Sequence, residues 1–100
     1  PAPFTLSEFE SATMPERVYS KEELLTYLEY CRTKWHTLIA SLTDETANQI
    51  WKNEYRSFTI FELLLYNMRH VQHHAAQLNL LLRQGINDAP RWVSQTKKAL

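Results

Sequence analysis

His70 and His74 lie four positions apart in a stretch whose apolar spacing predicts a helix from about residue 60 to residue 84. Side chains four apart lie one above the other on a helix, so two imidazole rings at this spacing can converge on one metal ion. Zinc, nickel and iron all accept imidazole nitrogen as a ligand. The spacing therefore predicts a pair of ligands for a divalent metal, with zinc or nickel as the expected ion.

The pair interrupts an apolar stripe that alternating steps of three and four residues trace along the same helix. The stripe runs through Ile60, Leu63, Asn67, His70, His74, Gln77 and Leu81. Its ends are apolar, whereas its middle four side chains carry nitrogen or oxygen. An unpartnered buried polar group costs about 1–3 kcal/mol. Four such groups would together cost a large share of a domain's stability, which is about 5–15 kcal/mol. A bound ion or ligand would offset that cost, and Asn67 and Gln77 are placed to orient it.

Other side chains near the pair have both functional and structural interpretations. Tyr66 lies on the His70 side of the helix, which favours a place at the pocket rim, and His73 turns toward the edge, where a surface or rim position is expected. His36 points off the apolar stripe of its own segment, so it is not expected to be a ligand. Cys31 lies in an apolar stripe and is expected to pack. Three aromatic residues could line a pocket, although buried aromatics more often form core: Trp51, Tyr55 and Trp92.

Two long helices are expected to hold these residues. Ser20 and Glu23 form a capping box that starts a helix running to about Leu42, and Thr59 with Glu62 starts a second one. Gly85 is expected to stop the second helix, as a glycine just past a helix does. The apolar stripe of the first helix runs through Leu24, Leu28, Cys31, Trp35, Leu38 and Leu42.

The remaining segments are expected to be short or irregular. Residues 1–19 are predicted to form a loop that packs against the body, and residues 43–51 a helical turn or two. Residues 52–58 read as a connector, and residues 91–100 as a tail that folds back. Only one glycine is present, which argues against hairpins, glycine-rich phosphate loops and a β-rich fold. The sequence therefore predicts an all-α protein.

Composition excludes several classes of protein. One hundred residues favour a single domain over residues 1–100, and the first residue is Pro1, which indicates processing or a piece of a longer protein. Eleven basic and eleven acidic side chains cancel, so no nucleic-acid partner is expected. No apolar run is long enough for a membrane span. A single cysteine permits no internal disulfide, which favours a cytoplasmic setting.

The stretch Leu-Tyr-Asn-Met-Arg-His-Val-Gln-His-His-Ala-Ala-Gln-Leu, residues 65–78, resembles the last helix of DinB-like (DinB/YfiT) proteins. That helix carries H-x-x-x-H, often followed by Arg-Gly-Gln. His70 and His74 match the histidines and Gln77 matches the glutamine, whereas Ala75 and Ala76 replace Arg-Gly. The Tyr-Ser-Lys-Glu-Glu-Leu-Leu entry into the first long helix resembles the family's second half, so the resemblance covers about residues 4–90.

The resemblance implies a four-helix bundle whose metal triad takes one histidine from an earlier helix and two from the last. This chain would then supply two long antiparallel helices, an N-terminal loop and two of three ligands, as the C-terminal half of such a bundle. An exposed apolar stripe normally meets a partner. We therefore expect either a missing N-terminal half or a homodimer in which two helix pairs complete the bundle.

Two classes of function follow from these observations. The resemblance implies a metal-dependent thiol S-transferase or hydrolase, in which a metal activates a small thiol substrate or water. The stripe carries no Asp or Glu as a general base, and Glu62 is explained by capping, so hydrolysis is the less favoured reaction. The alternative is a non-catalytic binding or dimerisation module with a structural or vestigial histidine pair, and this chain alone then need not hold a metal.

Overall fold

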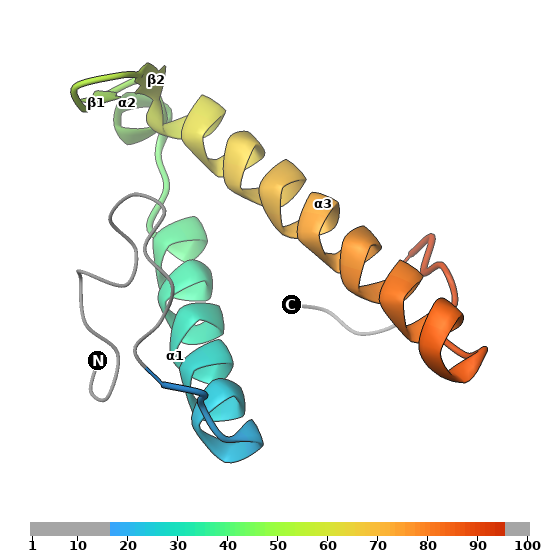
Figure 1. The fold of residues 1–100 in the computed structure, drawn as a ribbon. Coiled ribbons are helices and arrows are strands. Elements are labelled where there is room, and N and C mark those ends of the chain that lie inside the picture. The colour runs from blue at the N-terminus through green and yellow to red at the C-terminus, as the bar shows by residue number, and fades with distance from the viewer. Residues whose placement is uncertain (1–16, 96–100) are drawn as a thin grey trace. The chain divides into compact units, whose positions relative to one another are not determined.

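The computed structural model describes residues 17–95, so the expected loop at residues 1–19 lies almost wholly outside the described residues. The elements in chain order are α1 (Lys21–Ala40), α2 (Asp44–Ala47), β1 (Ile50–Lys52), β2 (Ser57–Thr59) and α3 (Ile60–Ile86) (Figure 1). The described chain is mostly helical, with two short strands. Its contacts divide it into two units, one ending at Ser41 and the other beginning at Leu42. Each unit is described by itself.

The expected capping box starts α1. The Ser20 hydroxyl accepts a hydrogen bond from the Glu23 backbone N–H at 3.2 Å, and the Glu23 carboxylate accepts one from the Ser20 N–H at 2.8 Å. Arg17 donates two hydrogen bonds to the same carboxylate, at 2.9 and 3.0 Å. These contacts, that of Arg17 first, hold the pKa of Glu23 below its ordinary value. The box fixes where α1 begins because it satisfies backbone groups that the first turn leaves unpaired.

The prediction of a plain connector at residues 52–58 is wrong. Strands β1 and β2 pair antiparallel, with Trp51 opposite Phe58 and Lys52 opposite Ser57. Asn53 closes the loop between them: its side-chain oxygen accepts hydrogen bonds from the Tyr55 and Arg56 N–H groups at 3.0 and 2.8 Å. An asparagine side chain can mimic a backbone turn in this way, so the hairpin needs no glycine.

The second capping box starts α3, where Thr59 and Glu62 satisfy each other's backbone N–H groups at 2.8 and 3.1 Å. The far end differs from expectation, because α3 passes through Gly85 and ends at Ile86, with Asn87 as its C-cap. Asn87 has the left-handed conformation, φ 54°, and its N–H donates to the Arg83 carbonyl at 3.0 Å. Asparagine tolerates this conformation better than most residues, so it ends the helix where glycine was expected to.

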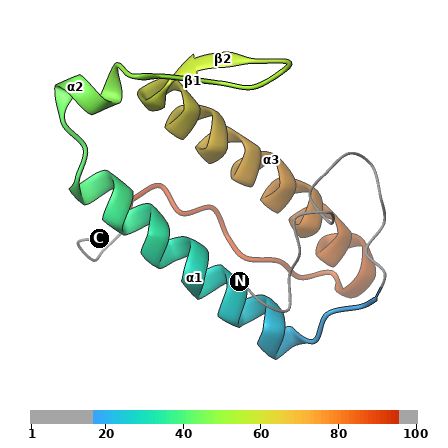
Figure 2. The same ribbon diagram turned by 90° about the vertical axis from the view of Figure 1, so that its left-hand side faces the viewer.

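After α3 the chain turns back beside the helix (Figure 2), where Pro90–Val93 and Ala76, Asn79, Leu80 and Arg83 line a hollow of about 510 Å³. The tail therefore folds back as expected as far as residue 95. Two of the aromatic side chains do not form core, because Tyr55 is 83% and Trp92 82% exposed. Cys31 is half-buried. Loss of solvent around the Tyr27 hydroxyl, and next its hydrogen bond with Cys31, raise the pKa of Tyr27.

The apolar stripes of both long helices are exposed. Within residues 17–95 only Leu64 is buried, whereas Leu28 on α1 is 61% and Leu81 on α3 is 63% exposed. A contiguous apolar face of this kind marks a surface that another element covers. No helix in the described part of the chain has the length and apolar character to cross a membrane.

Candidate metal centre

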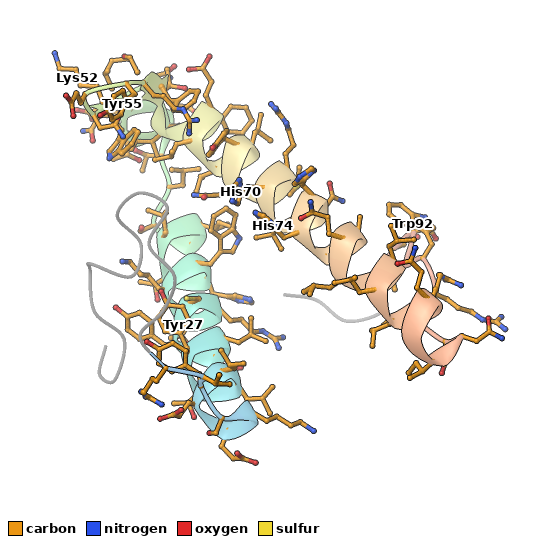
Figure 3. The ribbon with its side chains drawn as sticks, in the orientation of Figure 1. Tyr27, Lys52, Tyr55, His70, His74 and Trp92 are labelled. Carbon is orange, nitrogen blue, oxygen red and sulfur yellow. The ribbon has the colours of Figure 1, made fainter. Side chains whose placement is uncertain are left out.

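His70 and His74 extend from one side of the middle of α3, one turn apart (Figure 3). Their Nε2 atoms lie 3.1 Å apart. The ring centroids are separated by 4.6 Å, with the ring planes at 69° to each other. The helix thus turns the same nitrogen of each ring toward a common point, as the four-residue spacing allows.

Gln77 determines which nitrogen of His74 carries the proton. Its side-chain oxygen lies 2.9 Å from His74 Nδ1 and can only accept, so Nδ1–H is the donor. A neutral imidazole has one N–H, which leaves a lone pair on His74 Nε2. The 3.1 Å contact is therefore a hydrogen bond that His70 Nε2–H donates to His74 Nε2. His74 is held in the tautomer that a metal ligand at Nε2 requires.

The separation of the two Nε2 atoms fits a shared metal ion. Zinc binds imidazole nitrogen at about 2.0–2.1 Å, which places two such nitrogens about 3.3 Å apart at a tetrahedral angle and about 2.9 Å apart at a right angle. The observed 3.1 Å lies between these values. Binding of an ion would require His70 to give up its Nε2 proton. It would require little change in the helix.

Tyr66, one turn before His70 on α3, packs near the His70 ring. The Tyr66 and His70 ring centroids are 5.8 Å apart, with the planes at 32°. Phe58 of β2 stacks on Tyr66 at 5.4 Å, and Arg56 Nη1 donates to the Tyr66 hydroxyl at 2.6 Å. Sequence reasoning missed Phe58 and Arg56 because their contact with Tyr66 depends on the hairpin and not on helical spacing.

The other two candidates differ in their contacts: His73 packs against the histidine pair, and Asn67 makes no hydrogen bond to it. His73 lies against His74, with centroids 5.4 Å apart, and lines a hollow of about 280 Å³ with Tyr66, Arg69 and His70. The Asn67 side chain makes no hydrogen bond to any residue between 17 and 95, although it lies on the same stripe. His73 is therefore closer to the pair than its expected edge position indicates.

Both histidines of the pair are exposed, and so are Asn67 and Gln77. The expected burial of this polar group is thus not found within the unit that begins at Leu42, because the described residues of that unit leave the stripe exposed. Between residues 17 and 95 no group of three or more His, Cys, Asp or Glu side chains is placed to hold a metal ion. The pair itself brings two imidazole nitrogens together.

Comparison with known proteins gives one match. The family model of the DinB superfamily matches residues 2–78, which include α1, the hairpin and the histidine pair. No curated protein and no solved structure matches the sequence.

Proposed function

The chain belongs to the DinB superfamily, and from that premise we propose that it is a metal-binding domain in which His70 and His74 are two of the ligands. Proteins of this superfamily are generally helical and bind metal. The observation that carries the proposal is the 3.1 Å separation of the two Nε2 atoms, together with the hydrogen bond from His74 Nδ1–H to Gln77. This combination of two converging nitrogens and one oriented ring is typical of histidine metal sites.

The remaining ligands come from outside the described residues. The apolar stripe of α3 continues on both sides of the pair and is exposed, so a helix that covers the stripe would also reach the histidines. Two sources fit: a second copy of this chain, which would bring its own pair, or an N-terminal half of a longer protein that carries a third histidine. Either would complete a helical bundle.

The reaction we propose is transfer to the sulfur of a small thiol. A bound divalent ion would supply Lewis-acid chemistry that lowers the pKa of a thiol or of water. Gln77 holds His74 in the tautomer that has the lone pair on Nε2, and the side chains of both histidines are exposed. Hydrolysis is less favoured, because the stripe carries no Asp or Glu, and the carboxylate of Glu62, at the start of α3, is bound to backbone and hydroxyl groups of Thr59.

A metal titration tests the proposal. The metal-free chain is titrated with zinc and with nickel by calorimetry, as wild type and as the variants His70→Ala, His74→Ala and His36→Ala. We expect the first two variants to lose about 100-fold or more in affinity, since each removes a ligand. His36→Ala, on α1, should bind like wild type. Equal affinity in all four proteins would refute the assignment.

A non-catalytic module is the second candidate, and one observation favours it. The His70–His74 and His74–Gln77 hydrogen bonds satisfy the ring nitrogens that face each other without a metal. In that case the histidines order the helix surface for a partner helix. Absence of binding at saturating zinc and nickel would favour this module over the enzyme.

A further inference from the structure

His70 and His74 are oriented by different means. His74 donates from Nδ1 to Gln77, whereas Nδ1 of His70 makes no hydrogen bond to any residue between 17 and 95. The contact of His70 outside the histidine cluster is with the ring of Tyr66, one turn earlier on α3, at 5.8 Å between centroids. The orientation of the His70 ring therefore depends on packing against Tyr66.

Tyr66 is itself held from two directions, and both contacts come from the β1–β2 hairpin. Phe58 stacks on its ring at 5.4 Å with the planes at 28°. Arg56 donates to its hydroxyl at 2.6 Å, with the guanidinium carbon 5.1 Å from the ring centroid. A hydrogen bond at one end and a stacked ring along its face leave Tyr66 little freedom to rotate.

The hairpin that carries these contacts is well connected to α3. Trp51 stacks on Phe58 across the strands at 6.5 Å, and Asn53 fixes the loop next to Arg56. The Ile60 N–H donates to the Gln49 carbonyl at 2.9 Å, which ties the first residue of α3 to the start of the hairpin. All of these residues belong to the same unit, Leu42–Leu100.

We propose that the β1–β2 hairpin positions His70 for metal binding, with Arg56 and Tyr66 as the positioning residues. Tyr66 holds the His70 imidazole in the orientation in which its Nε2 meets that of His74, and Arg56 holds Tyr66. This proposal rests on the proposed function, since it assigns a role in the same site. An imidazole that is already oriented loses less freedom when it binds an ion, so affinity rises.

Linkage gives the proposal a second consequence. If the hairpin strengthens metal binding through Tyr66, metal binding must stabilise the hairpin by the same factor. The amide protons that close the hairpin, those of Asn53 and Ile60, should then exchange more slowly with solvent in the metal-loaded chain. A loop that merely packs beside the helix would show no such change.

Three variants separate the contacts of Tyr66 with His70 and with Arg56, and a fourth variant serves as a control. Tyr66→Leu removes the ring, Tyr66→Phe keeps the ring but loses the acceptor for Arg56, and Arg56→Ala removes the donor. Lys52→Ala is the control, because Lys52 lies in the same hairpin and its side chain makes no hydrogen bond or ion pair within residues 17–95. The affinities for zinc and nickel are measured by calorimetry. The tautomer and mobility of the His70 ring are measured by nitrogen-15 NMR of the metal-free chain.

We expect Tyr66→Leu to weaken zinc binding by about 10-fold or more, the range seen when groups behind a metal ligand are removed. Tyr66→Phe and Arg56→Ala should give smaller losses of about 3-fold, and Lys52→Ala none. In the metal-free chain Tyr66→Leu should release the His70 ring into a mixture of tautomers, and Tyr66→Phe should largely preserve it.

Unchanged His70 ring signals in Tyr66→Leu would overturn the proposal, whatever its zinc affinity. If Tyr66→Leu does not fold, zinc affinities of Tyr66→Phe and Arg56→Ala that equal that of Lys52→Ala would overturn it. If the wild type binds neither zinc nor nickel, the proposed function fails, while the ring signals of the metal-free variants still test whether the hairpin orients His70. The two failures are thus distinguishable.

Discussion

The orientation of His74 depends on one side-chain hydrogen bond, which comes from a residue three positions further along α3. Gln77 accepts from His74 Nδ1 at 2.9 Å and so leaves the lone pair on Nε2. The same residue is the one that matches the glutamine of the family's motif. We propose that Gln77 selects the tautomer in which His74 can bind a metal, and that role predicts a measurable effect on metal affinity.

Gln77→Met keeps the length of the side chain and removes the acceptor. We expect it to lower zinc affinity by about 10-fold, because His74 is then free to carry its proton on Nε2. The measurement is calorimetric titration with zinc. Gln72→Met is the matched control, since Gln72 is an exposed glutamine of α3 whose side chain makes no hydrogen bond within residues 17–95. An equal effect of the two substitutions would contradict this role.

Residues that act through helical spacing could be predicted from the sequence, and residues that act through the hairpin could not. The proximity of His70, His74 and Gln77 follows from steps of three and four residues within one helix. Arg56 and Phe58 reach Tyr66 only because the chain reverses at residues 53–56, and no periodic pattern encodes that contact. Asn67 shares the stripe but has no polar group within reach in the described chain.

At the scale of elements, the starts of the helices could be predicted and one end could not. Both capping boxes are local four-residue patterns, so Ser20 and Thr59 fix the starts of α1 and α3 as expected. The end of α3 depends on which residue enters the left-handed conformation, and both Gly85 and Asn87 are suited to it. The structure uses Asn87, so Gly85 lies within the last helical turn.

The effect of Gly85→Ala on the free energy of unfolding shows whether α3 continues through Gly85 to Asn87 or stops at Gly85. Nothing lies within 4 Å of a Cβ placed there, and its backbone is helical. Gly85→Ala should therefore raise the free energy of unfolding by about 0.5–1 kcal/mol. Asn87→Ala, at φ 54°, should lower it by about 1 kcal/mol. Denaturation with urea measures both, and a destabilising Gly85→Ala would show that the helix stops at Gly85.

The Arg17–Glu23 pair predicts a pH dependence at the start of α1. The pKa of Glu23 is lowered from 4.5 in the folded chain, chiefly by Arg17. The contribution of this pair is therefore fully present above about pH 4.5 and is lost as the pH falls through the lowered value. Glu23→Gln should remove this part of the acid-induced loss of helix, measured by circular dichroism, whereas Glu22→Gln should keep it. Identical acid profiles for both variants and wild type would rule out this effect.

At the scale of the whole molecule, the predictions of helical content and family are confirmed. Both depend on long stretches of periodic pattern and on the motif at His70 and His74. The predicted absence of hairpins is wrong, because it was inferred from the lack of glycine, and Asn53 supplies the turn instead. The partner of the apolar stripes could not be predicted, because the spacing of apolar residues shows that a face is apolar and not which element meets it.

The exposed stripes predict that the chain associates when metal is present, if a second copy supplies the missing ligands. Two copies would bring four imidazoles together, and the α3 stripe of each copy would cover that of the other. Native mass spectrometry should then give a dimer with zinc and a smaller dimer fraction for His70→Ala. A zinc-bound monomer would exclude the second copy as the source of ligands and favour an N-terminal half.

The most direct test of the central claim is a zinc titration of the chain followed by NMR of its histidine ring nitrogens. We expect the Nε2 signals of His70 and His74 to shift together and saturate at one stoichiometry, while those of His36 stay in place. His74 Nδ1 should stay protonated throughout. Zinc-induced shifts at His36 or His73 with none at the pair would contradict the claim that His70 and His74 are the metal ligands.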